Sequence, residues 1–160
     1  MRAQNGFSVI ELLIAVAIIL VISAIAVPGL LHSHVAANET QAVAAMRQID
    51  IAQSAYSSAY GQGYAPTLRE LGPPADPKAK VSSASAGMLD RELGCASQPC
   101  MRAGYGFEID APKSRPLSSY HSVAMPLRLG VTGGRGFCDD QTHRLMFDSD
   151  GQGNCRENLQ

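Results

Sequence analysis

The chain has 160 residues, which is enough for one modest domain and an appendage. Its 13 Lys and Arg side chains are balanced by 14 Asp and Glu side chains, so the net charge is close to zero. This balance argues against a large basic surface for nucleic acid, and we expect no nucleic-acid partner. Apolar residues make up 46% of the chain, but they are concentrated near its N-terminus.

Residues 7–31 form an apolar run that contains a single charged residue, Glu11. A helix of this length can cross a hydrocarbon layer of about 30 Å. Three interpretations are open. The run is a secretory signal peptide cleaved near Ala24-Ile25-Ala26, or an uncleaved signal anchor, or the start of a mature chain whose short leader is removed ahead of it.

Glu11 favours the third interpretation. A carboxylate inside a membrane-spanning segment is costly unless it is paired or neutralised, and a plain signal peptide or anchor has no use for it. Cleavage after Gly6 frees the α-amine of Phe7, and Glu11 follows one helical turn later on the same face. Glu11 can therefore pair with this amine or with the amine of a neighbouring chain.

The segment Gly6-Phe7-Ser8-Val9-Ile10-Glu11-Leu12 resembles the processing motif of type IV prepilins and of the related pseudopilins of type II secretion. The resemblance implies that a membrane peptidase cuts after Gly6 and methylates Phe7, and that Glu11 guides assembly. Pro28 falls where many members of this family have a proline that kinks the helix. The simpler alternative is that the helix ends at Pro28-Gly29, because proline removes a helical hydrogen bond.

Small apolar residues recur at helical spacing from Val35 to Tyr60 and predict one apolar stripe. The stripe consists of Ala42, Ala45, Ile49, Ala52, Tyr56 and Ala59, and polar residues such as Glu39 and Asp50 cover the other faces. Joined to the apolar run, this segment predicts a helix of some 50 residues, roughly 80 Å long. A domain of about 100 residues covers only part of such a helix, so lipid or other subunits must bury the rest.

Shorter elements are expected after the long helix. Gly61-Gln62-Gly63 ends it, and Thr67 caps a short turn through Leu71, with Glu70 in the capping-box position. A second brief helix is expected from Met88 to Leu93, beyond a proline-rich loop.

Alternating residues in the last third predict three or four antiparallel strands, one face of which the long helix covers. Tyr105, Phe107 and Ile109 share one face of the first, and His121, Val123, Met125 and Leu127 share one face of the second. Phe137, and then Leu145 and Phe147, indicate two more.

The four cysteines, Cys95, Cys100, Cys138 and Cys155, are all in the C-terminal half. An even number in a Gly- and Pro-rich domain behind an apolar segment indicates two disulfides in an oxidising compartment. Three pairings are possible, and proximity favours Cys95–Cys100 with Cys138–Cys155. A zinc site is disfavoured because paired C-x-x-C motifs are absent from the sequence.

Two further groups of residues were weighed as binding sites. Asp148, Asp150 and Gln152 have the alternating oxygen ligands of a calcium loop, but Leu159 occupies the position of the final bidentate Glu, which favours an ordinary turn. Arg128, Arg135 and Arg144 are candidates for a basic patch, although as many acidic residues lie nearby in the sequence. We therefore expect no cofactor, no resident metal and no catalytic activity.

The sequence thus predicts an α+β, type IV pilin-like fold, with a long N-terminal α-helix packed on a small antiparallel β-sheet and a disulfide-bounded C-terminal region. Its parts are a leader (1–6), a transmembrane or filament-core helix (7–31), an amphipathic continuation (32–60) and a globular domain (61–160).

The function implied by the resemblance is that of a pilin, which assembles with copies of itself into a type IV pilus. A type II secretion pseudopilin is the alternative, and a signal-anchored periplasmic binding domain is the second. The implied partners are a prepilin peptidase and methyltransferase, an inner-membrane assembly platform and, before assembly, membrane lipid. The chain is expected to cross the inner membrane once and then to enter an extracellular pilus or a periplasmic pseudopilus.

Overall fold

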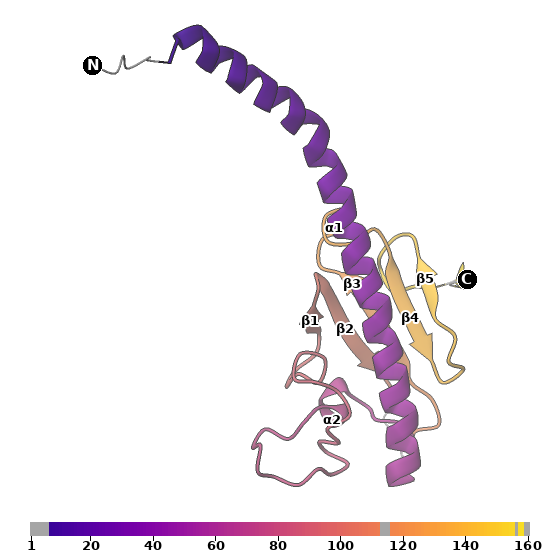
Figure 1. Cartoon of the computed structure of the whole chain (residues 1–160). Helices are drawn as coiled ribbons and strands as arrows, with labels where there is room; N and C mark the ends of the chain where they lie inside the picture. The colour runs from indigo at the N-terminus through magenta and orange to yellow at the C-terminus, as the bar shows by residue number, and fades with distance from the viewer. Residues whose placement is uncertain (1–6, 113–115, 156, 159–160) are drawn as a thin grey trace. The chain divides into compact units, whose positions relative to one another are not determined.

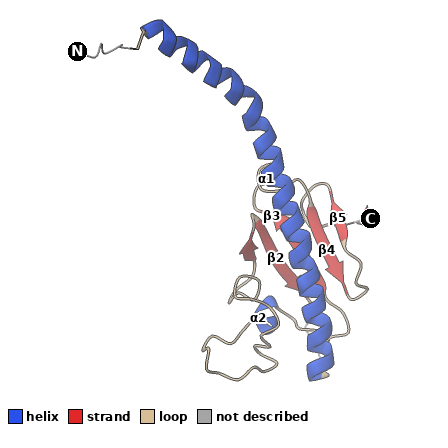
Figure 2. Ribbon diagram, in the orientation of Figure 1, coloured by secondary structure: helices blue, strands red, loops and turns tan. Residues whose placement is uncertain are grey.

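The computed structural model describes residues 7–112, 116–155 and 157–158. Figures 1 and 2 show a long helix, a much shorter one and an antiparallel sheet. The elements are α1 (Val9–Tyr60), α2 (Leu68–Leu71), β1 (Cys100–Arg102), β2 (Tyr105–Asp110), β3 (His121–Pro126), β4 (Gly136–Asp140), β5 (Met146–Asp148) and β6 (Glu157–Asn158).

The chain divides into two compact units, Met1–His34 and Val35–Gln160, and the boundary between them falls within α1. The helix passes through Pro28-Gly29 without ending, so the alternative that it stops there is wrong. A kink at Pro28 stays a prediction.

The second unit contains a six-stranded sheet in which every strand pairs antiparallel with the next one in the chain. The fold is therefore α+β and type IV pilin-like, as the sequence predicts. The sheet has more strands than the three or four expected, because β1 and β6 have only three and two residues. Strands this short leave too little alternation to be recognised.

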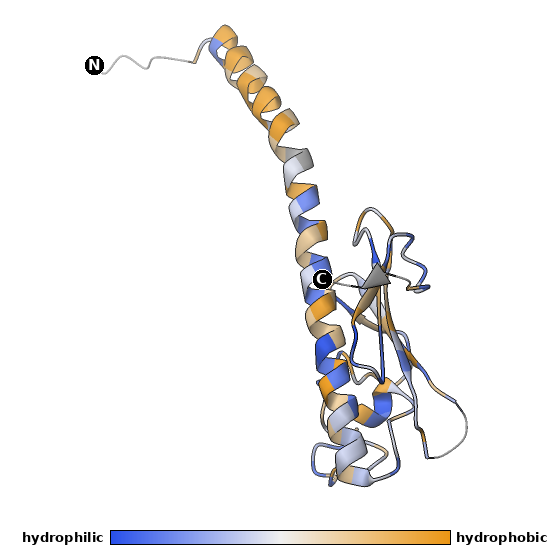
Figure 3. Cartoon of the chain, turned by 90° about the vertical axis from the view of Figure 1, so that its right-hand side faces the viewer, coloured by the Kyte–Doolittle hydropathy of each residue, from blue (hydrophilic) through white to orange (hydrophobic). Residues whose placement is uncertain are grey.

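The part of α1 within the second unit lies along one face of this sheet (Figures 2 and 3). Five of the six members of the predicted stripe, Ala42, Ala45, Ile49, Ala52 and Tyr56, are buried, and they pack with Tyr105, Phe107 and Phe137 of the sheet. Their small side chains let the helix approach the strands closely.

Three positions on this part of α1 differ from the prediction, and the first is Met46, which is buried although it was not placed in the stripe. Ala59 is exposed, and Gln53 is buried instead. The Gln53 amide donates to the Ala65 carbonyl over 2.9 Å and accepts from the Ala65 N–H over 2.8 Å. Both polar atoms of the Gln53 side chain therefore have hydrogen-bond partners. These bonds hold the chain that reverses direction after α1 against the helix.

Strand β3 presents its larger side chains away from α1. The register pairs Ala124 with the buried Phe107, which places Ala124 and Ser122 on the helix side. His121, Val123 and Met125 share the opposite face, as expected, whereas Leu127 lies beyond the strand. A Cβ atom at Gly153 would lie 3.6 Å from Val123 and Met125 side-chain atoms, so the C-terminal loop partly covers this outer face.

The turn chemistry of the connecting region is only partly as expected. The helix α1 ends before Gly61, and Thr67 caps α2 by accepting from the Glu70 N–H. No helix forms from Met88 to Leu93, so that prediction is wrong. The Asp90 carboxylate instead accepts from the backbone N–H groups of Glu92 and Leu93, both over 3.0 Å, and forms a tight turn.

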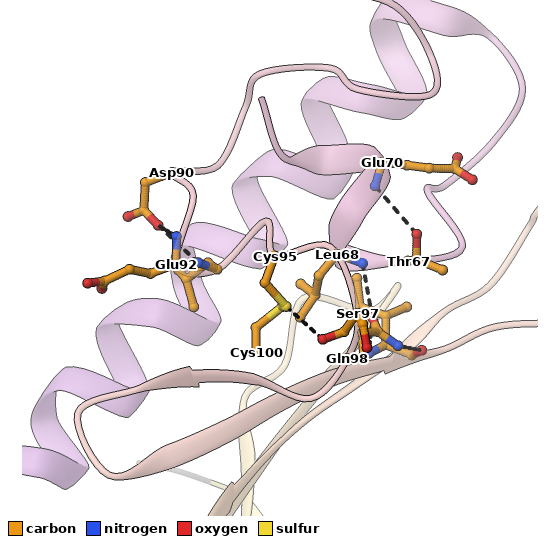
Figure 4. Close-up of a disulfide and its surroundings, with 11 residues drawn as sticks. Thr67, Leu68, Glu70, Asp90, Glu92, Cys95, Ser97, Gln98 and Cys100 are labelled. Atoms are coloured by element: carbon orange, nitrogen blue, oxygen red, sulfur yellow. Dashed lines mark hydrogen bonds between the residues drawn. A yellow bond between two sulfur atoms is a disulfide. The ribbon is translucent and has the colours of Figure 1, made fainter. Parts of the chain in front are cut away.

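Both disulfides have the pairing that proximity favoured, Cys95–Cys100 and Cys138–Cys155. Figure 4 shows the first one, with Gln98 inside its short loop. The Gln98 side-chain oxygen accepts from the N–H groups of Leu68 and Ile109 over 3.0 and 3.1 Å. The first disulfide loop therefore ties α2 to β2.

Candidate functional site

The candidate site is the apolar first part of α1. Its described large apolar residues, from Phe7 to Leu31, are between 47% and 77% exposed. The helix includes a stretch long and apolar enough to cross a membrane, and none of that stretch is buried. A continuous apolar surface of this size is unfavourable in water and requires lipid or protein to cover it.

The start of this helix contains the polar groups of the site. Val9 is the first helical residue, so Ser8 occupies the N-cap position and Glu11 the third helical position. The first helical bond runs from the Leu12 N–H to the Ser8 carbonyl over 3.1 Å. Ser-x-x-Glu is the capping-box arrangement, and a carboxylate in the first turn also complements the helix dipole. The sequence analysis missed this local role for Glu11.

The processing position itself is only partly within the structure. Gly6 and the rest of residues 1–6 lie outside the described residues. Phe7 is described, is highly exposed and precedes the helix. Phe7 and Glu11 lie on the same helical face only if the helix includes Phe7, which is two residues before the first residue of α1.

A bidentate ion pair fastens α1 to the sheet near the start of the second unit. The Glu39 carboxylate accepts from Nε and Nη2 of Arg135 over 3.1 and 2.9 Å, and from the Gly134 N–H over 2.8 Å. The Arg135 guanidinium also lies over the rings of Phe137 and Phe147. Because Arg135 is engaged in this way, the basic patch weighed for Arg128, Arg135 and Arg144 lacks one of its members.

A second polar cluster fastens the same helix further along. One oxygen of Asp50 accepts from the Tyr120 hydroxyl over 3.0 Å and pairs with Nδ1 of His143. This pairing raises the pKa of His143 above its usual value. Asp139 lies nearby and is 3% exposed, and its burial, followed by the charge of Asp50, raises its pKa to about 6.

These fastenings were not predicted, since they join residues that are far apart in the chain: Glu39 and Arg135 are separated by 96 positions. The acidic residues of the amphipathic helix were assigned to the solvated face, and nothing local in the sequence indicates a partner. Chemically, both clusters hold the helix against the sheet.

The calcium candidate is organised as a turn. The two oxygens of Asp148 accept from the N–H groups of Gly136, Gly151 and Asn154 over 3.1, 2.7 and 2.8 Å. Asp150 accepts from the N–H of Gln152 over 2.9 Å, so its carboxylate serves the same loop. Among the described residues, no three acidic, His or Cys side chains gather as a metal site.

Residues 1–27 match the family model of the prokaryotic N-terminal methylation motif. No curated protein and no solved structure shows a significant match to the chain. In this chain, a long apolar helix begins within the matched residues and is followed by a disulfide-stabilised sheet domain.

The motif supports the class of type IV pilins and pseudopilins, whose members are generally structural rather than catalytic. The apolar helix near the N-terminus fits a single-pass membrane anchor.

Proposed function

We propose that this chain is a structural subunit that polymerises into a type IV pilus after cleavage following Gly6 and methylation of Phe7. The observation that carries the proposal is the apolar first part of α1, none of whose described residues is buried and which begins within the matched motif. A pilus subunit needs this surface twice, first in contact with lipid and then in contact with other subunits.

Before assembly, the apolar run holds the chain in the inner membrane, where a prepilin peptidase and methyltransferase processes it. An assembly platform in that membrane then moves the subunit out of the lipid. The same side chains that contacted acyl chains become buried against the helices of neighbouring copies. The exchange of one apolar environment for another supports this route, since neither step exposes the helix to water.

Glu11 sets the axial register between neighbouring subunits in the filament. In the filament, its carboxylate pairs with the methylated amine of Phe7 in a neighbouring subunit, which neutralises both charges in an apolar setting. The position of Glu11 in the first turn of α1 supports this proposal, because it places the carboxylate close to the N-terminal end of the helix.

A pseudopilin of type II secretion shares the same motif and helix. Two disulfides clamp the sheet domain and its C-terminal loop, and such clamps suit a filament outside the cell, so they favour the pilus. The second alternative, a signal-anchored binding domain, requires polar groups that converge on a cavity. The polar clusters of the second unit instead fasten α1 to the sheet.

The experiment is immunogold electron microscopy of filaments sheared from the cell surface, with antibody against the second unit. We expect labelled filaments from the native chain and none from a Gly6→Leu variant, which retains its leader. A periplasmic product without surface filaments indicates the pseudopilin. A native amount of labelled filament from the Gly6→Leu variant contradicts processing-dependent assembly.

A further inference from the structure

The loop between β3 and β4, residues 127–133, presents aliphatic side chains to solvent. Leu127, Leu129 and Val131 are 49%, 54% and 55% exposed. Single exposed apolar residues are common on protein surfaces, but three alternating along one short loop form a patch. None of the three belongs to the hydrophobic core.

Hydrogen bonds give this loop a fixed shape. The N–H groups of Val131 and Thr132 donate to the Arg128 carbonyl over 3.0 and 2.9 Å, and the Gly130 N–H donates to the Gly133 carbonyl over 2.8 Å. The Thr132 hydroxyl accepts from the Arg128 N–H over 3.0 Å. A loop that satisfies its own backbone in this way presents its side chains in a defined arrangement.

The loop is attached to the part of α1 that belongs to the second unit. The Asn38 amide donates to the Thr132 carbonyl over 2.9 Å, and Glu39 accepts from the Gly134 N–H directly after the loop. Figure 1 shows the β3–β4 loop at the end of the sheet where this part of α1 lies. In the sequence, Asn38 follows Leu31, the last residue of the apolar run, by seven positions.

Arg128 and Asp150 are exposed charged residues beside the patch. Arg128 is exposed within the loop, and within the described residues its guanidinium has no ion-pair partner. Asp150 is exposed in the neighbouring loop, where a Cβ atom at Gly151 would meet the Leu129 side chain. Apolar side chains flanking an exposed arginine suit the boundary between acyl chains and anionic headgroups.

We propose that the β3–β4 loop docks on the membrane surface while the subunit is held in the bilayer. Leu129 and Val131 enter the headgroup and acyl boundary, and Arg128 contacts lipid phosphate. This inference rests on the membrane-held stage of the proposed function. The docked loop fixes the second unit against the surface, and the contact is released when the subunit leaves the membrane.

The test uses the absence of tryptophan from the sequence. Three single-tryptophan variants of the full chain, Val131→Trp, Val81→Trp and Val21→Trp, replace similarly exposed valines in the loop, in a remote loop and in the apolar run. Each is reconstituted in phosphatidylethanolamine and phosphatidylglycerol vesicles, with or without lipids brominated at a shallow or a deep acyl position.

We expect blue-shifted emission from Val131→Trp and quenching by the shallow bromines, with neither effect in Val81→Trp. Val21→Trp should be quenched by the deep bromines. If Val21→Trp is quenched and Val131→Trp behaves like Val81→Trp, the docking proposal fails and the membrane-held stage stands. If Val21→Trp is not quenched, the membrane-held stage fails as well.

Two further results address the occupant of the patch. A blue shift of Val131→Trp without bromine quenching shows that a second copy covers the loop, which overturns the lipid assignment. Arg128→Gln in the Val131→Trp background should weaken quenching in vesicles that contain phosphatidylglycerol and leave it unchanged in zwitterionic vesicles. If Arg128→Gln leaves the quenching of Val131→Trp unchanged in both kinds of vesicle, Arg128 does not contribute to the site.

Discussion

Replacing Glu39 by Ala tests whether the Glu39–Arg135 pair holds α1 on the sheet. The substitution removes the acceptor for the part-buried Gly134 N–H, which costs about 1 kcal/mol. It also removes the bidentate contact with Arg135. Because the Arg135 side chain is 43% exposed, that contact contributes only about 0.5–1 kcal/mol. Alanine has a higher helix propensity than Glu, which offsets a few tenths of a kcal/mol of this loss. We therefore expect a net loss of about 1.5 kcal/mol in the free energy of unfolding.

The assay is urea unfolding of the full chain in detergent micelles, followed by near-ultraviolet circular dichroism. All five tyrosines lie between residues 56 and 120, so the tyrosine signal reports the second unit. Glu39→Gln is the matched control, since its amide oxygen can still accept from Gly134, and it should lose less than Glu39→Ala. A double-mutant cycle with Arg135→Ala isolates the pair. A coupling energy indistinguishable from zero, or a Glu39→Ala variant as stable as the native chain, refutes the reasoning.

Three other predictions concern assembly, pH and the disulfides. Glu11→Ala should abolish efficient filament assembly while near-ultraviolet dichroism stays native. Glu11→Gln, which keeps a capping side chain but not the charge, should also fail to assemble. Normal filaments from Glu11→Gln would mean that Glu11 acts only as a helix cap. The free energy of unfolding should fall as pH rises above about 4, because the folded state binds protons more tightly at two groups. Asp139 loses its contribution as pH rises from its unfolded pKa of 3.8 through about 6, and His143 loses its own as pH rises from 6.5 through its raised pKa. An unchanged pH profile for Asp139→Asn and His143→Gln would contradict this. Replacing both cysteines of Cys138–Cys155 by Ser should lower the free energy of unfolding by about 3 kcal/mol, and the same change at Cys95–Cys100 by about 2 kcal/mol. The first loss is larger because the longer loop restrains the unfolded chain more. The reverse order in urea unfolding would contradict the loop-entropy reasoning.

The features that could be predicted from the sequence are those encoded locally. The apolar run and the Ala42 to Tyr56 stripe follow the helical period, and Thr67 precedes its turn at the spacing that capping requires. Tyr105, Phe107 and Ile109 alternate as a half-buried strand should. The motif from Gly6 to Leu12 is likewise a short continuous segment, so a single sequence was sufficient to recognise it.

The features that could not be predicted depend on distant parts of the chain. Alternation assigns Val123 and Met125 to a core face, but they lie on the side opposite α1, where the disulfide-closed C-terminal loop partly covers them. Asp90 competes with helix formation in its own segment by binding two backbone N–H groups. Glu39 is indistinguishable in sequence from a solvated helix residue until the fold brings Arg135 to it.

The central claim is that the chain is a filament subunit whose leader is cleaved off after Gly6, on the N-terminal side of the apolar helix. The most direct measurement is the intact mass and N-terminal sequence of the mature protein extracted from membranes. The account predicts a chain that begins at Phe7 and carries one additional methyl group. A mature chain that begins at Met1, or at Val27 after the Ala24-Ile25-Ala26 segment, contradicts it and leaves an anchored or a secreted protein.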